Sequence, residues 1–212
     1  MAYADRTDAG QRLARELAGY AGRDDVLVLG LVRGGVPVAA QVAAFLGAPL
    51  DVLVVRKLGV PWAPEVAFGA VGPGGLIVHN PEVEAQLSPA DMARVTNAES
   101  EELARRERQY RGGRPPLDLR GKEVIIVDDG LATGATARAA VGVARAAEAA
   151  RVIMAVPVAA AESLAAVRAE ADEVVCPWVP AGFSAVSTFY ENFPQVTDDE
   201  VIATLAQAHH PA

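Results

Sequence analysis

Cysteine, aromatic residues and long apolar runs are scarce in this sequence. The single cysteine, Cys176, excludes a disulfide framework within the chain and a zinc site built from several thiolates. The uncharged apolar stretch at residues 36–50 is interrupted by Pro37, Gly47 and Pro49 and is too short to span a bilayer. The first ten residues carry charged side chains and lack the apolar core of a signal peptide. These absences predict a soluble, cytoplasmic protein without a membrane partner.

Positive charge is also in deficit. Lys and Arg number 19 against 27 Asp and Glu, which gives a formal net charge of -8. Because affinity for nucleic-acid backbones comes from cationic patches, this balance argues against a nucleic-acid partner. Two common phosphate-binding loops are missing as well. Neither the Walker A string Gly-x-x-x-x-Gly-Lys-Ser/Thr nor the dinucleotide-binding string Gly-x-Gly-x-x-Gly occurs in the chain.

Apolar residues make up 51% of the chain, which is enough for a sizeable core. Apolar runs typical of buried strands alternate with helical segments. Strands are expected at 25–30, 50–55, 76–79, 123–127, 152–158 and 173–176, and helices at 8–19, 37–45, 88–110, 137–149, 163–169 and 198–208. Asp8 and Ser88 are expected to cap two of the helices, and segment 59–69 to form a loop. The alternation predicts one α/β domain over residues 1–212, a Rossmann-like parallel sheet with helices on both faces.

The strand at 123–127 leads into Asp-Asp-Gly-Leu-Ala-Thr-Gly-Ala-Thr, residues 128–136. Ligands of open α/β sheets bind where the strands end, so two adjacent carboxylates reach the ligand edge. The next residues are small, and the following helix N-terminus offers free N–H donors and a positive dipole end. Thr133 and Thr136 add hydroxyl donors. The pattern predicts a phosphate cradle, with carboxylates upstream that can accept hydrogen bonds from two vicinal sugar hydroxyls. A turn of purely structural use is the simpler alternative.

Residues 124–136 resemble the PRPP-binding motif of type I phosphoribosyltransferases: an apolar strand, two acidic residues, three residues, then Thr-Gly-x-Thr. PRPP is 5-phosphoribosyl diphosphate. The resemblance implies that Asp128 and Asp129 bind the ribose 2- and 3-hydroxyls. It assigns the 5-phosphate to Ala132, Thr133, Gly134, Ala135 and Thr136. It also implies a Mg²⁺ cofactor held through PRPP, with Asp128 and Asp129 as candidate ligands.

Ala132 bears on the acceptor. Hypoxanthine- and guanine-type members of the family carry an aspartate before Thr-Gly that handles the purine N7 proton, and that general acid or base is missing here. The Leu-Ala-Thr-Gly run is closer to the adenine-type and orotate-type versions without identifying either. The resemblance therefore implies a nitrogen nucleophile as acceptor, and in this family a nucleobase of nucleotide metabolism.

A second strand-to-helix turn, Leu-Val-Arg-Gly-Gly-Val at residues 31–36, follows the first strand at the same sheet edge. Its glycines permit close approach and Arg33 adds a cation. By resemblance this is the pyrophosphate loop, in which family members often hold a non-proline cis peptide bond. The residues assigned to it are Val32, Arg33, Gly34 and Gly35. Arg56 and Lys57, at the end of the strand at 50–55, either neutralise pyrophosphate as well or form a solvated strand end.

Other cations and one tryptophan are harder to place. Segment 59–65, which contains Trp62, stands where family members carry a mobile catalytic loop. Trp62 could cover the site, plug a hydrophobic gap or form a dimer contact. The charged residues at 105–114 are expected to be a solvated helix face, although Arg111 or Arg114 could reach pyrophosphate in the same or a neighbouring subunit.

Five of the scarce aromatic residues lie between 178 and 193. In the resembled family a small hood over the sheet edge recognises the acceptor. Residues 177–196 with part of the N-terminus are the hood candidate, beside a core at about 24–176. Phe183, Phe189 and Tyr190 are candidates to stack on a base, although such rings can equally serve only to bury the hood.

The resemblance implies a phosphoribosyltransferase that forms a homodimer. It would transfer the 5-phosphoribosyl group of PRPP to a nitrogen acceptor and release pyrophosphate, with Asp128, Asp129, Arg33 and Lys57 as the catalytic residues. The alternative is a non-catalytic regulator that senses PRPP or a nucleotide on the same fold. A phosphosugar phosphatase is a weaker third hypothesis, because no nucleophilic constellation supports it.

Overall fold

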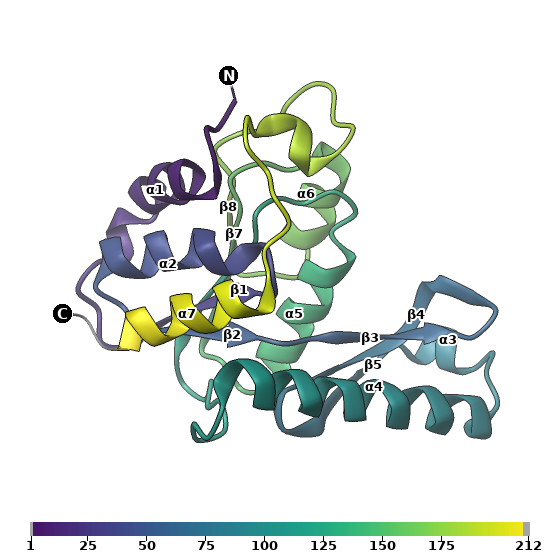
Figure 1. Ribbon diagram of the computed structural model, residues 1–212. Helices are drawn as coiled ribbons and strands as arrows, with labels where there is room; N and C mark the ends of the chain where they lie inside the picture. Colours follow the sequence, from purple (N-terminus) through teal and green to yellow (C-terminus); the bar gives the residue numbers. More distant parts are fainter. Residues whose placement is uncertain (1, 210–212) are drawn as a thin grey trace.

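Five short apolar strands form a parallel sheet in the order β2-β1-β6-β7-β8 (Figure 1). The computed structural model describes residues 2–209. The strands are Val26–Leu31 (β1), Leu50–Leu53 (β2), Glu123–Val127 (β6), Arg151–Ala155 (β7) and Glu173–Val175 (β8). Gly30 of β1 lies opposite Val127 of β6, so these two neighbouring strands end side by side. The predicted parallel α/β sheet is confirmed, and its carboxyl edge brings the two predicted loops together.

Helices cover both faces of this sheet (Figure 1). Successive side chains of a strand point to opposite faces. Val28 and Ile125 accordingly pack with one set of helices and Leu29 and Ile126 with the other. The first face carries Arg6–Glu16 (α1), Gly35–Leu46 (α2) and Asp198–His209 (α7), and the second carries Ala135–Ala146 (α5) and Ala161–Arg168 (α6). Within residues 2–209, no helix combines the length and the apolar character needed to cross a bilayer.

The segment expected to be a loop at 59–69 is instead part of a second, antiparallel sheet. Its strands are Arg56–Val60 (β3), Ala63–Gly72 (β4) and Leu76–His79 (β5), in the order β3-β4-β5. Pro61 lies in the turn between β3 and β4. Pro64 lies in the part of β4 that has no β5 neighbour, where a missing N–H costs no ladder hydrogen bond on that side. The prolines were therefore compatible with strands, and the prediction of a loop was wrong.

The second sheet projects from the main body together with the helices Pro81–Glu84 (α3) and Pro89–Arg111 (α4) (Figure 1). Trp62 lies at the hairpin turn and is 65% exposed, so it does not plug a gap within this chain, while covering the site and forming a dimer contact stay predictions. Three short 3-10 turns complete the structure: Ala18–Tyr20, Pro73–Gly75 and Val186–Phe189.

Local signals located most helix ends. Ser88 caps α4 by accepting the Asp91 N–H at 3.1 Å, as predicted, and Gly47 ends α2 with a φ of 66°. The start of α1 was predicted wrongly. Asp5 is the N-cap, and Asp8 lies one turn later, where its N–H donates to the Asp5 carboxylate at 2.9 Å. Either aspartate could serve as a cap, and tertiary contacts of the first turn decide between them.

Candidate functional site

The loop between β1 and α2 lies directly against the acidic pair that follows β6. A Cβ atom built on Gly34 would overlap Oδ2 of Asp129, and one on Gly35 would overlap the carbonyl oxygen of Val127 and crowd the Cα of Asp128. Both glycines are therefore required by the close approach of two loops. The peptide bond between Val32 and Arg33 is cis. The pyrophosphate loop at residues 31–36 and the loop after β6, which were assigned to opposite ends of one ligand, are thus in direct contact.

Asp128 and Asp129 are adjacent carboxylates that differ in their partners. Asp128 Oδ1 accepts the backbone N–H of Asp129 at 2.9 Å. Asp129 Oδ2 accepts from Nε of Arg6 at 2.9 Å, and Nη2 of Arg6 lies 2.9 Å from the same oxygen. Burial, and then the charge of Asp129, raise the pKa of Asp128 well above its ordinary value. Burial also raises the pKa of Asp129, while the Arg6 guanidinium opposes that rise. Asp129 is therefore the carboxyl of the pair whose rise in pKa is opposed by a direct cationic partner.

The segment Ala132–Thr136, predicted as a phosphate cradle, is anchored to α6 by a hydrogen bond. Ser163 Oγ donates to the carbonyl oxygen of Ala132 at 2.5 Å. Gly134 precedes α5 with a φ of 72°, in the left-handed region that favours glycine. Thr133 and Thr136 are exposed. The helix begins at Ala135, two residues earlier than predicted, so the last two residues of the segment belong to its first turn, whose N–H groups have no acceptor within the helix.

The cations predicted for pyrophosphate fall in three different places. Arg33 faces an open depression of about 520 Å³ that Arg6, Gly34 and Asp129 also line. Lys57 lines a separate cavity of about 710 Å³ between the second sheet and α5, together with Ala135. Arg56 does not point to either, because its Nε lies 2.6 Å from Oε2 of Glu99 on α4. Arg56 and Lys57 begin β3 and do not end β2, so the predicted strand end was wrong, while their assignment to pyrophosphate stays a prediction.

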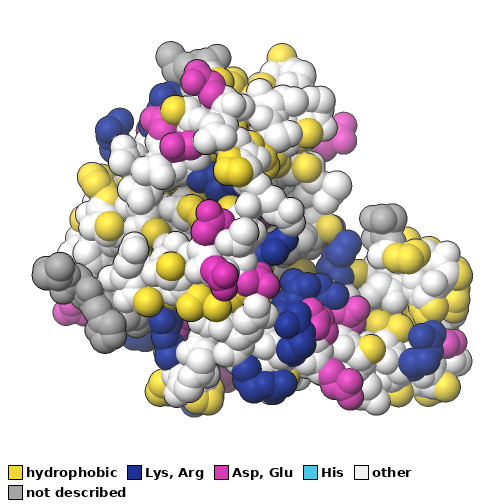
Figure 2. All heavy atoms as spheres, in the orientation of Figure 1, with side chains coloured by type: hydrophobic (Ala, Val, Ile, Leu, Met, Phe, Trp, Pro, Cys, Tyr) yellow, Lys and Arg dark blue, Asp and Glu magenta, His cyan; other side chains and the backbone are white. Residues whose placement is uncertain are grey.

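Lys and Arg side chains gather where the main body meets the projecting second sheet and α4, as Figure 2 shows for one face of the molecule. Several of these cations have acidic partners, as Arg56 does. The concentration of positive charge near the sheet edge is consistent with an anionic ligand, although the net charge of the whole chain is -8.

The N-terminal segment and the tail before α7 pack on each other above the sheet edge. Tyr3 donates its N–H to the carbonyl oxygen of Phe189 at 2.8 Å, and its own carbonyl oxygen accepts from Glu191 N–H at 2.8 Å. Tyr190 donates its hydroxyl to the carbonyl oxygen of Asp129 at 2.6 Å, which ties this layer to the acidic pair. The predicted hood, residues 177–196 with part of the N-terminus, corresponds to this layer.

Two of the three rings proposed to stack on a base do not offer a face to a ligand. Phe189 and Tyr190 are buried within the layer, and Phe183 packs on Phe189 with ring centroids 5.1 Å apart. The ring that lines the depression beside Asp129 is Phe193, which was not among the candidates. Composition could show that the tail is aromatic, but it could not show which rings pack inwards.

A family model described as "Phosphoribosyl transferase domain" matches residues 3–188. The chain belongs to the phosphoribosyltransferase family. The protein "Putative phosphoribosyl transferase Rv0571c" of Mycobacterium tuberculosis strain H37Rv is 53% identical over 207 residues, which cover 97% of this chain and 46% of that protein. A second M. tuberculosis strain gives the same values. The chain therefore spans about half the length of the curated relatives it matches.

A solved structure has the same fold over nearly the whole chain. The crystal structure of TT1426 from Thermus thermophilus superposes with a TM-score of 0.90 at 43% identity, covering 98% of this chain and 99% of that chain. Residues 124–136, which resemble the PRPP motif, lie within the residues 3–188 that the family model matches.

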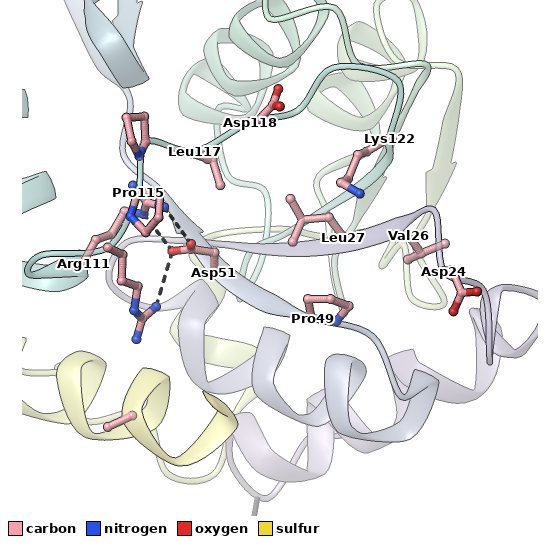
Figure 3. A pocket seen from close by; sticks show the side chains of 13 residues that line it. Asp24, Val26, Leu27, Pro49, Asp51, Arg111, Pro115, Leu117, Asp118 and Lys122 are labelled. Atoms are coloured by element: carbon pink, nitrogen blue, oxygen red, sulfur yellow. Dashed lines mark hydrogen bonds and ion pairs between the residues drawn. The ribbon is translucent and has the colours of Figure 1, made fainter. Parts of the chain in front are cut away.

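Arg111 and Arg114 do not reach the ligand edge. Both line a cavity of about 640 Å³ beside the opening residues of β1 and β2, at the opposite edge of the sheet, and Figure 3 shows Arg111 there beside Asp51. Arg111 donates to both carboxylate oxygens of Asp51 at 3.0 Å, and Arg114 Nη1 lies 3.8 Å from Oδ1 of the same carboxylate. The prediction that one of these arginines reaches pyrophosphate in its own subunit was therefore wrong.

Sequence reasoning missed three polar residues of the site. Arg6 contacts Asp129, Asp198 lies 3.6 Å from Arg33, and Ser163 holds the phosphate segment. Each lies on a different helix and far along the chain from its partner. No spacing or motif in the sequence marks these residues, so only the fold could reveal them.

Proposed function

We propose that this chain transfers the 5-phosphoribosyl group of PRPP to a nitrogen nucleophile and releases pyrophosphate. The observation that carries the proposal is the contact between Gly34 and Asp129, because it joins an anion loop to a sugar-binding carboxylate. A ligand with phosphate at both ends and vicinal hydroxyls between them suits such a surface. In the proposed complex the 5-phosphate occupies the segment Ala132–Thr136 and the pyrophosphate lies on the Val32–Gly35 turn.

Binding both ends of PRPP holds C1 of the ribose in place for attack from the side opposite the leaving group. The bond from C1 to the pyrophosphate oxygen breaks as the bond to the acceptor nitrogen forms. Carboxylates near the ribose favour the positive charge that develops at C1, and Arg33 favours the negative charge that develops on pyrophosphate. Lys57 is proposed to assist from the neighbouring cavity that it shares with Ala135.

Mg²⁺ suits this donor set as an ion held between protein and ligand. Among residues 2–209 there is no group of three or more His, Cys, Asp or Glu side chains that could hold a metal by themselves. Mg²⁺ is commonly bound by one or two carboxylates together with substrate phosphates and waters, and Asp128 and Asp129 provide such carboxylates. When bound there, the ion would neutralise part of the pyrophosphate charge.

The acceptor is proposed to be a nucleobase that enters the depression lined by Phe193, Asp129 and Arg33. Ala132 leaves no carboxyl at the position where hypoxanthine- and guanine-type members have one, which favours a different base. The hood role of residues 177–196, the homodimer and the cytoplasmic location stay predictions of the family resemblance.

The test is to incubate the chain with PRPP, Mg²⁺ and single bases from a panel, and to measure pyrophosphate release. We expect release that depends on one base and on Mg²⁺. The double variant Asp128→Asn/Asp129→Asn is the control, and it should neither release pyrophosphate nor bind PRPP in calorimetry. PRPP binding without release for any base would instead indicate a sensing role. Unchanged PRPP affinity in the double variant would refute the assignment of the acidic pair.

A further inference from the structure

Arg6 connects three separate segments at the edge of the sheet. Its side chain, on the first turn of α1, is only 10% exposed. Nε and Nη2 lie 2.9 Å from Asp129 Oδ2, and Nη1 donates to the carbonyl oxygen of Pro194 at 2.7 Å. The guanidinium carbon lies 3.7 Å from the centroid of the Phe193 ring. One side chain thus joins α1, the acidic pair and the tail.

Two residues restrict the Asp129 carboxylate. Arg6 contacts Oδ2, and Gly34 lies so close to the same oxygen that a Cβ atom on the glycine would overlap it. Tyr190 fixes the main chain of Asp129 through its carbonyl oxygen. Arg6 reaches only Oδ2, and within residues 2–209 no other side chain donates to the Asp129 carboxylate, so Oδ1 is left without a side-chain donor beside the depression.

We propose that Arg6 is a positioning residue, which holds Asp129 so that its second oxygen receives a ribose hydroxyl and which makes PRPP binding depend on the first turn of α1. The inference rests on the proposed function, because it assigns Asp129 to the ribose. Two nitrogens of one planar guanidinium converge on Oδ2, and they restrict where that oxygen lies and favour its negative charge. An aspartate on a sharp turn without such a partner would sample other side-chain orientations and bind the sugar less well.

A purely structural role for Arg6 predicts something different. Arg12, on the same helix, also stacks on an aromatic ring of the terminal layer, with its Cζ 5.3 Å from the centroid of Tyr3. Arg12 also has an acidic partner, Asp8, at 2.7 Å, but it does not contact the acidic pair. A substitution of Arg12 therefore disturbs the attachment of α1 to the N-terminal segment without disturbing Asp129. This makes Arg12 the matched control for Arg6.

A blocking role would predict the opposite sign. If Arg6 occupied Asp129 at the expense of the ribose, its removal would strengthen PRPP binding. The positioning role predicts weaker binding, so the direction of the change separates the two. A role in stability alone would lower the fraction of competent protein and leave the affinity of that fraction unchanged.

The experiment is isothermal calorimetry with PRPP and Mg²⁺ on the full chain and on three variants. We expect Arg6→Met to weaken PRPP binding on the order of 10- to 100-fold with an unchanged stoichiometry. Arg6→Lys, which keeps the charge but has a single nitrogen in place of three, should recover part of the lost affinity. Arg12→Met should stay within about twofold of the parent chain. Thermal unfolding of each variant shows that it is folded.

Three results would overturn the inference: PRPP affinity of Arg6→Met equal to or tighter than that of the parent, an equal loss in Arg12→Met, or a loss of stoichiometry without a loss of affinity. Absence of PRPP binding by the parent chain would refute the proposed function instead. In that case, crystal structures of the parent and of Arg6→Met test the positioning role without PRPP, by comparing the position of the Asp129 carboxylate. Rotation of the Asp129 carboxylate away from its present position supports the inference, and an unmoved carboxylate overturns it.

Discussion

Asp198, the first residue of α7, lies 3.6 Å from Arg33, measured from its Oδ1 to Nη1 of the arginine. The same carboxylate accepts from the hydroxyl of Tyr110 at 2.7 Å and from Nε2 of Gln109 at 2.8 Å. These hydrogen bonds, with that of Tyr110 the stronger influence, lower the pKa of Asp198 and keep it anionic. The cation proposed to receive pyrophosphate is thus paired with an acid from the end of the chain when no ligand is present.

We expect Asp198→Asn to strengthen pyrophosphate binding about two- to fivefold, because Arg33 no longer has a competing anion and the pair is partly exposed. Asparagine retains a side-chain oxygen that can accept from Tyr110. Calorimetry with pyrophosphate and Mg²⁺ measures the change. Asp199→Asn, which alters the next residue of the same helix, is the control and should bind like the parent chain. Weaker binding in Asp198→Asn would show that Asp198 supports Arg33 and does not compete for it.

The close approach of Gly34 to Asp129 provides a second prediction. Gly34 has a φ of -61°, a conformation that alanine adopts readily, so the cost of Gly34→Ala comes from the overlap with Asp129 Oδ2. Relieving the overlap must move the carboxylate or the turn, and we expect PRPP affinity to fall about tenfold or more. Titration calorimetry with PRPP measures the loss.

Gly19→Ala is the matched control for that substitution, because a Cβ atom at Gly19 meets no atom within 4 Å. It should leave PRPP affinity and the unfolding midpoint near those of the parent. Equal PRPP affinity in Gly34→Ala and the parent would mean that the turn moves freely and that the contact with Asp129 does not shape the site.

The parts of this site that the sequence predicted are those with a local pattern. The apolar run Glu123–Val127 was predicted with the bounds that the structure shows, since a fully buried strand leaves a continuous apolar signature. The two loops were located because strand ends, glycines and small residues lie next to one another along the chain. Their meeting across the sheet edge followed from β1 and β6 being neighbours.

The parts that the sequence did not predict depend on contacts between distant segments. Arg6 and Asp129 are 123 positions apart, and neither neighbourhood indicates the other. The β3–β4 hairpin was mistaken for a loop because two prolines occupy positions where the sheet needs no donor. The inward packing of Phe189 and Tyr190 depends on Tyr3, which reaches them only through the fold. In each case the sequence shows the type of residue, but it does not show which distant segment the side chain contacts.

Ser163 is predicted to control the 5-phosphate end of the site. Its hydroxyl donates to the carbonyl oxygen of Ala132, and removing the donor leaves that oxygen without this bond. We expect Ser163→Ala to weaken binding of ribose 5-phosphate about three- to tenfold, since a typical hydrogen bond contributes about 1 kcal/mol. Binding can be followed by a ligand-induced shift in thermal unfolding. Ser100→Ala on α4, remote from the phosphate segment, should not change it, and an equal effect of the two substitutions would contradict the role of Ser163.

Asp128 is predicted to lower the stability of the folded chain at neutral pH. Its pKa is raised above the unfolded value by burial and by the charge of Asp129. A carboxyl with a raised folded pKa contributes stability that is present below its unfolded pKa and is lost as the pH rises through its folded pKa. Asp128→Asn removes that loss and keeps an oxygen that can accept from Asp129 N–H.

We therefore expect Asp128→Asn to be more stable than the parent at pH 7, on the order of 1 kcal/mol, and the gain to disappear below about pH 4, where the parent carboxyl is protonated in both states. Urea unfolding at a series of pH values measures the difference. Asp118→Asn, at an exposed position away from the pair, should show no such gain. A variant that is less stable at pH 7 would mean that the charge of Asp128 is satisfied in the folded chain. A variant that is more stable but no longer binds PRPP would show that the acidic pair is retained for binding at the expense of stability.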